Sequence, residues 1–413
     1  MTEQDTHMMQ SEPEDMTFLD IVWGQFKKNR MAYAAMWLVV VLFLLAVYAP
    51  VIASERPFIW QDSEGTYFPW FSSLFDHNYY ENGVDKFFNL LLILGTPLFV
   101  VWWFMLRSTQ KSGLEKRLRR QKIRKFSSVM VIGFLVVFLG VILTQSGQVN
   151  RYNFDSYEAA KAEGKAVSAL FPPIAYTYSR QSLEEKLQQP NAKHIMGTDR
   201  KGRDVAVRIL FGTRISLSVG VIAVGIYVTI GIFLGAFAGF FRGRVDMIIQ
   251  RVIEIFMSVP TLIVLLVMIS FIEKPSIFHI MVVIGLFRWT GVARLVRGEF
   301  YRLRNLDFVT SAIALGYSNR RIIFQHILPN ALGPVLVAAT FGVAAAILLE
   351  SSLSFLGLGD ISVPSWGQTL NAGYKTGEWY LILIPGIAIF ITVTLLNLIG
   401  EGLRDALDPK MRK

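Results

Sequence analysis

Long apolar stretches alternate with polar ones along most of this chain. A helix needs about 20 mostly apolar residues to cross the hydrocarbon layer of a bilayer. Eight segments approach or reach that length, and we expect each to span a membrane. They are residues 32–53, 89–106, 127–145, 214–240, 252–272, 277–295, 332–353 and 380–400. The pattern therefore predicts an all-α polytopic membrane protein with about eight spans.

The charges between these segments predict the side of the membrane that each loop faces. Residues 107–125 carry nine Lys or Arg and one acid, Glu115, whereas residues 54–88 carry six acids and two bases. The loops at 241–251 and 296–331 are basic again. Basic loops lie in the cytosol by the positive-inside rule. With alternating sides, all eight segments agree on an inner-membrane protein whose two termini are cytosolic.

The same pattern divides the chain into six consecutive regions. They are a cytosolic tail with an interfacial helix (1–31), a first span (32–53), an external loop with an inserted two-span basic hairpin (54–145), a second external loop (146–213), a core domain (214–403) and a cytosolic C-terminus (404–413). Within the second external loop we expect short helices at 155–166 and 182–189.

The composition excludes several kinds of chemistry. The chain has no cysteine, and its five histidines are scattered without the spacing of metal ligands. The net charge of +10 follows from the positive-inside bias, so we expect the lipid bilayer and no nucleic acid as a partner. No P-loop motif occurs, so we expect no catalytic residue, cofactor or metal on this chain. The predicted spans contain no acid pair or acid–histidine relay, which argues against a proton- or sodium-driven carrier.

Residues 307–329 differ from an ordinary loop between membrane helices. The segment is long and predicted helical, and a span follows it at once. Gly316 permits a sharp turn, and Pro329 should end the preceding helix and fix the angle of the next span. Such a helix is suited to contact something in the cytosol. The candidate residues are Asp307, Thr310, Ser311, Ala312, Leu315, Gly316, Arg320, Arg321, His326, Leu328 and Pro329.

Two further groups of residues are candidates for gating or packing. The external stretch Gly197, Thr198, Asp199, Gly202, Arg203 and Asp204 is either a gate or partner interface, or a turn whose aspartates accept backbone N–H groups; we favour the turn. Small residues at four-residue spacing allow close approach of helices in lipid. They are Gly231, Gly235 and Gly239 in the fourth span, and Gly342 and Ala346 in the seventh.

Four stretches, in order, resemble the C-type permeases of oligopeptide and dipeptide ABC importers. They are Met196-Gly-Thr-Asp-Arg-Lys-Gly-Arg-Asp-Val205 running on to Ser216, then Arg251, Glu254 and Pro260, then Glu350–Gly359 with Trp366-Gly367, and finally Gly400–Pro409. Residues 307–329 are similar to the EAA loop of these permeases. Asn29-Arg30 and residues 54–58 and 67–69 look most like the Yej-type branch.

The resemblance implies a type I ABC-importer transmembrane domain with a MetI-like core, and no enzymatic activity of its own. Its partners would be a B-type permease, ABC ATPase subunits that carry ATP and Mg²⁺, and an external peptide-binding protein. Residues 307–329 would sit in a cleft of the ATPase and move when ATP closes it. The cargo would be peptides or peptide-like antibiotics, with opines and nickel left open. We expect Ser258, Thr340 and Ser351 to line the path.

Three features depart from the family pattern. The family usually has six spans, and the two extra ones here are 89–106 and 127–145. The expected Glu-Ala-Ala is Thr310-Ser311-Ala312, which removes one polar contact to the ATPase. The external loop before Gly197 is also long. Two alternatives stay open: a secondary transporter or channel, and a membrane assembly protein, neither with an ATPase partner.

Overall fold

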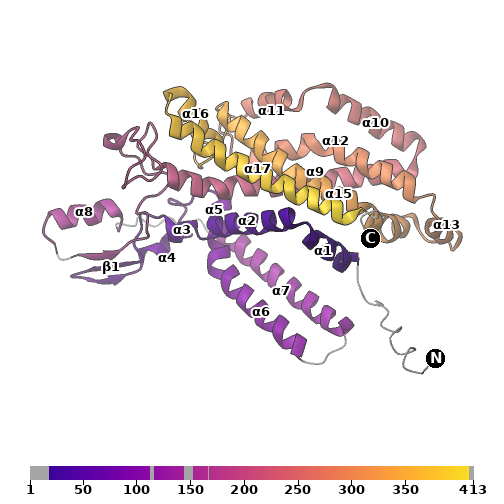
Figure 1. Cartoon of the computed structure of the whole chain (residues 1–413), viewed down its shortest axis with the longest axis horizontal. Coiled ribbons are helices and arrows are strands. Elements are labelled where there is room, and N and C mark those ends of the chain that lie inside the picture. Colours follow the sequence, from indigo (N-terminus) through magenta and orange to yellow (C-terminus); the bar gives the residue numbers. More distant parts are fainter. Residues whose placement is uncertain (1–17, 112–115, 144–151, 166, 409–413) are drawn as a thin grey trace, which may run out of the picture.

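The computed structural model describes residues 18–111, 116–143, 152–165 and 167–408 of the 413-residue chain. Seven of the described helices are long and apolar enough to cross a membrane, and a bent pair adds an eighth crossing if it counts as one span. Figure 1 shows an elongated molecule, with the strands near one end and α13 (Asp307–Ala314) at the other. The prediction of a helical, polytopic chain is confirmed.

Four long helices form the centre of the bundle. They are α9 (Val205–Phe241), α12 (Ile277–Leu303), α15 (Leu328–Phe355) and α17 (Trp379–Leu407), with α2 (Arg30–Val47) packed on α9 and α17. Between α13 and α15 lie α14 (Asn319–Arg321) and η3 (Ile322–Ile327), and α16 (Trp366–Thr376) packs on α15 and α17. A Cβ on Gly231, Gly235 or Gly239 of α9 would collide with α12. Gly342 of α15 meets Tyr227 of α9 in the same way.

The segment 252–272, expected to span the membrane, is broken in the structure. Helix α10 (Gly243–Ser258) ends just before Val259-Pro260, and α11 (Thr261–Ser270) continues at an angle of 79°. A proline disfavours helical backbone in the residue before it, and its ring clashes with the preceding turn. Pro260 therefore explains the break.

The two extra spans form a hairpin beside the bundle. Helix α5 (Gly83–Leu90) continues through the π-helical turn η1 (Leu91–Gly95) into α6 (Thr96–Lys111), and α7 (Lys116–Leu143) returns beside it. Figure 1 shows α6 and α7 diverging from the core. In the most apolar stretch of each helix, none of the α7 residues is buried, against 56% of those in α12.

A small antiparallel sheet, for which the sequence pattern gave no sign, lies towards the end opposite α13 (Figure 1). Its order is β2 (Gly65–Tyr67), β1 (Ile59–Asp62) and β3 (Ser168–Leu170), accompanied by α3 (Ala49–Ile52), α4 (Pro69–Ser73) and α8 (Phe154–Ala162). The short helix expected at 155–166 corresponds to α8. The one expected at 182–189 is reduced to a 3₁₀ turn, η2 (Leu183–Glu185).

The N-terminal helix α1 (Phe18–Lys28) packs on protein along its apolar face. Val22 and Phe26 are buried against Ala406 of α17, while Trp23 is exposed. This arrangement differs from the expected interfacial helix, whose apolar face would lie in lipid. The structure thus joins the two ends of the described chain through one small cluster.

Candidate functional site

Helix α13 projects from the end of α12 and shows an apolar face to the outside. Val309 and Ala312 are buried in the cluster that includes residues of η3, and they fix the helix to the bundle. Phe308 and Leu315 remain 41% and 72% exposed. Exposed apolar groups at the tip of an anchored helix are typical of a protein-binding surface. Thr310 is exposed, and its hydroxyl donates a hydrogen bond to the carbonyl of Asp307 at 3.0 Å.

Gly316 ends α13 with a left-handed turn. Its φ is +73°, the N–H of Gly316 bonds to the carbonyl of Ile313 at 2.9 Å, and that of Tyr317 bonds to Ala312 at 3.1 Å. This pair of bonds is the Schellman motif, in which glycine avoids the steric penalty of a Cβ. No atom lies within 4 Å of the Cβ position. The turn therefore needs glycine for its backbone conformation and not for space.

The expectation that Pro329 ends a helix is wrong. The chain is helical from α14 through η3 into α15 without a break, and Pro329 occupies the first turn of α15. In η3 the hydrogen bonds widen to a π pattern, and the N–H of Leu328 reaches the carbonyl of Ile323. Such a bulge accommodates the missing proline donor. One continuous helix thus runs from the segment after α13 deep into the bundle.

Two basic residues in the second half of the segment line a groove. The Arg321 guanidinium lies 4.1 Å from the ring centre of Tyr317, and the His326 ring packs on the same tyrosine at 5.6 Å. Arg320 and Arg321 line a groove of about 580 Å³ together with Phe233 of α9. Positively charged side chains thus lie next to apolar ones in the groove at this end of the molecule.

The predicted external residues form a tight turn before α9. Both oxygens of the Asp199 carboxylate are used: one accepts the backbone N–H groups of Lys201 and Arg203, and the other bonds to Arg203 Nε at 2.7 Å. Burial opposes ionisation of Asp199, but the guanidinium groups of Arg203 and Arg208 and the backbone N–H of Lys201 together outweigh it and lower the pKa of this carboxyl. Gly197 and Gly202 have φ of +76° and +69°, and a Cβ on Gly202 would collide with the carbonyl of Ser182.

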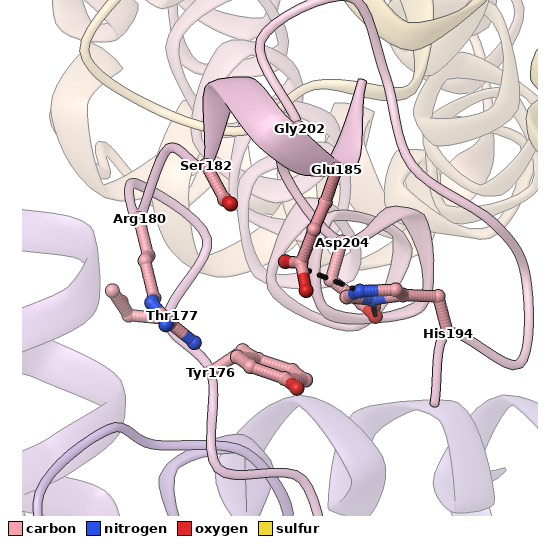
Figure 2. A pocket seen from close by; sticks show the side chains of 8 residues that line it. All are labelled: Tyr176, Thr177, Arg180, Ser182, Glu185, His194, Gly202 and Asp204. Carbon is pink, nitrogen blue, oxygen red and sulfur yellow. Dashed lines mark hydrogen bonds and ion pairs between the residues drawn. The ribbon is translucent and has the colours of Figure 1, made fainter. Parts of the chain in front are cut away.

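Asp204 connects this turn to a small polar cavity, shown in Figure 2. One carboxylate oxygen caps α9 by accepting the N–H of Val207 at 3.0 Å, and the other contacts His194 Nδ1 at 2.8 Å. His194 Nε2 lies 3.5 Å from Glu185, and the ring stacks on Tyr176. Within the described ranges, no group of three or more His, Asp or Glu is arranged to hold a metal ion. These contacts serve a structural role, because they connect the start of α9 to the segments that carry His194, Glu185 and Tyr176.

Each of the three residues expected to line a path bonds within its own helix. The Ser258 hydroxyl bonds to the carbonyl of Ile255 at the end of α10, and that of Thr340 bonds to Val337 inside α15. Ser351 is buried beside Glu350. In the described part of the chain, no hydrogen bond joins any two of these three side chains.

Two buried polar clusters were missed by reasoning from sequence. Arg214 of α9 bonds to Asp85 and Asn89 of α5, each at 3.0 Å, and to the carbonyl of Ala46 at 2.7 Å. The spacing of Asp85 and Asn89, four residues apart on one helix face, was the available signal.

Glu350, fully buried in α15, is the centre of the second cluster. It accepts bonds from Ser354 and from Ser365, the N-cap of α16, each at 2.7 Å. The cluster thereby joins α15 to α16. The sequence placed Glu350 at a predicted span end, and its serine partners lie within or just after a family signature.

Comparisons with known proteins place these features in context. Residues 231–413 match the family described as binding-protein-dependent transport system inner membrane component, and residues 17–79 match the N-terminal TM domain of oligopeptide transport permease C. The dipeptide transport system permease protein DppC of Bacillus subtilis is 41% identical over 254 residues, which cover 60% of this chain and 79% of that protein. The oligopeptide transport system permease protein OppC of Haemophilus influenzae is 40% identical over 250 residues, covering 60% and 80%. Among solved structures, the inward-facing MetNI methionine ABC transporter matches with a TM-score of 0.41 and 18% identity, over 49% of this chain and 96% of that chain.

Proposed function

The chain belongs to the family of binding-protein-dependent inner membrane components, with the oligopeptide and dipeptide C-type permeases, and from this premise we propose that it forms half of the translocation path of an ATP-driven peptide importer. A second, B-type permease would supply the other half. ATP and Mg²⁺ would bind to separate ATPase subunits, and none to this chain. The peptide would be delivered by an external binding protein, which also sets most of the specificity.

The single observation that carries the proposal is the geometry of α13. The helix is fixed to the bundle by Val309 and Ala312, and it presents Phe308 and Leu315 to the outside. Hydrophobic anchors surrounded by polar groups dominate the energy of many protein interfaces. The nearby groove with Arg320 and Arg321 adds cations that suit acidic groups on the ATPase. The basic loops support a cytosolic location for this end and for both termini, by the positive-inside rule.

Motion of α13 has a continuous mechanical route into the bundle. On one side α12 ends just before α13, and on the other the helix from α14 to α15 has no break. Glycine-mediated contact of α12 with α9 extends the route to a third helix. Coupling between two sites needs an element that both sites bias. We infer that ATP binding moves α13, and that α12 and α15 carry this movement to the path.

Thr310 stands where the family usually has a glutamate. Its hydroxyl bonds within α13 instead of projecting a charge. The apolar face and the Schellman turn remain, so we infer that the ATPase still binds through them with one polar contact fewer. The finer placement on the Yej-type branch stays a prediction.

Purification of the C-terminally tagged chain from native membranes in mild detergent tests this function. We expect an ABC ATPase and a second permease to co-purify with the wild type, and Gly316→Asp to lose the ATPase. Gly164→Asp is the matched control, because Gly164 has a φ of +72° and equally open surroundings but lies far from α13 in the chain. If no ATPase accompanies the wild type, or if both variants lose it equally, the proposal fails.

A further inference from the structure

The end of the α6–α7 hairpin that lies away from α5 is strongly basic. Trp102 of α6 donates a hydrogen bond to Ser127 of α7 at 3.1 Å. Beyond this pair, residues 103–111 and 118–126 contain seven basic residues and no acid. They are Arg107, Lys111, Arg119, Arg120, Lys122, Arg124 and Lys125, and all but the half-buried Arg119 are exposed. We call these seven residues the basic tip.

Two side-chain contacts involve residues of the basic tip. The Arg107 guanidinium lies 3.6 Å from the ring centre of Trp103, which sets a cation beside an exposed aromatic ring. This combination is common at the boundary between membrane and water. Arg120 forms an ion pair with Asp20 of α1 at 3.1 Å. The tip is therefore tied to α1, and through α1 to α17.

The length of α7 places the basic tip at the level of lipid headgroups. The largely apolar stretch 126–143 rises about 27 Å, close to the thickness of the hydrocarbon layer. Residues 118–125 add about 12 Å of helix, and the headgroup region on each side is roughly 5–8 Å deep. The basic side chains thus extend across the headgroups on a helix that continues into the bilayer.

We propose that the basic tip binds anionic phospholipid headgroups, with α7 covered by the acyl chains of the same lipids. Four to eight Lys or Arg next to a membrane helix attract anionic lipid. No residue in the most apolar stretch of α7 is buried within this chain, so the surface of the helix is open to acyl chains. Figure 1 also shows the end of the hairpin apart from α13, where the ATPase is proposed to bind. The assignment of these headgroups to the cytosolic leaflet rests on the proposed function. The preference for anionic lipid does not depend on it.

Native mass spectrometry of the purified full-length chain tests this site. The protein in detergent is offered equal amounts of phosphatidylglycerol and phosphatidylcholine with the same acyl chains, and bound copies of each are counted. We expect the wild type to retain phosphatidylglycerol, and Lys122→Gln/Lys125→Gln to bind it about thirtyfold more weakly. Lys122→Arg/Lys125→Arg should keep the binding. The control Arg244→Gln/Arg404→Gln removes two exposed cations elsewhere and should also keep it.

Each contrary outcome overturns the assignment. Equal retention of both lipids by the wild type, or unchanged retention by the glutamine variant, shows that the tip selects no anionic lipid. Displacement by inorganic phosphate at matched ionic strength shows a general anion site instead. Loss of a co-purifying protein with unchanged lipid binding shows a protein interface. Melting temperatures of all variants are compared with the wild type, because only a folded variant reports on the site.

Discussion

The core bundle and the inserted hairpin are both apolar and helical, yet they are built on different principles. In the core, Gly235 of α9 touches the backbone of α12, and polar groups such as Glu350 are buried and paired. In α7, Gly133 has no atom within 4 Å of its Cβ position, and no residue in the most apolar stretch is buried. Close-packed protein neighbours restrict the size and shape of side chains, whereas lipid does not. Apolarity alone therefore does not reveal which helices carry the mechanism.

The buried ion pair between α9 of the core and α5, which leads into the hairpin, gives the largest expected effect. Arg214 and Asp85 are almost completely buried and lie 3.0 Å apart. Asp85→Ala should lower the stability by about 3–5 kcal/mol, because the arginine charge stays buried without its acid. Glu254→Ala, which removes an exposed pair with Arg251, should change it by at most about 1 kcal/mol. Thermal unfolding of the two detergent-purified variants measures these changes in stability. Equal melting temperatures of the two variants would refute the role of the Arg214–Asp85 pair.

Exposed apolar residues should also behave differently in the two regions. Phe308→Ser/Leu315→Ser on α13 should weaken ATPase binding by about 2–4 kcal/mol while leaving the fold intact, since both side chains are exposed. Leu139→Ser on α7 should leave ATPase binding unchanged. Affinities come from titration of purified permease complex with the ATPase. Similar losses in both variants would remove the distinction between a protein-facing and a lipid-facing surface.

Glycine substitutions sharpen the comparison of packing. Gly235→Ala should destabilise the protein by about 1–3 kcal/mol through overpacking against Ala293. Gly133→Ala should be neutral or slightly stabilising, because alanine is the better helix former and space is free. Unfolding midpoints of the two variants provide the test. A loss of stability at Gly133 would mean that α7 packs against protein.

Restoring the family residue should have the smallest effect. Thr310→Glu places an acid in the first turns of α13, where the helix dipole favours it, and offers the ATPase one more polar contact. We expect affinity for the ATPase to rise by less than about 1 kcal/mol, with no change in stability. The same titration measures it, and a weakened complex would show that this ATPase has adapted to threonine.

Most of the helical framework could be predicted from sequence because spans are long and their pattern is simple. The break at Pro260 was missed because the apolar run continues across it, although the proline was visible. The opposite error occurred at Pro329, where the π-turn of η3 accommodates the ring and the helix goes on. The strands were missed because each has only three or four residues, too short for an alternating pattern to register.

The candidate site was predictable where its chemistry is local. Gly316 and its turn lie within a few residues of α13, so the sequence of this short segment was enough to predict a helix followed by a sharp turn. Arg214 bonds to Asp85, which is 129 residues away in the sequence, and to the carbonyl of Ala46, which is 168 residues away. Such contacts depend on how helices are arranged in space, which no local pattern encodes. Path-lining residues have the same difficulty, because a path between two permeases also depends on the other chain.

The chain has no cysteine, so single cysteines can compare the two surfaces most directly. Leu315→Cys and Leu139→Cys would each be placed in the otherwise cysteine-free permease and treated with a short bifunctional cross-linker in native membranes. The account predicts that position 315 cross-links to the ABC ATPase, whereas position 139 cross-links to no protein. A cross-link to the ATPase from position 139 and none from position 315 would contradict it.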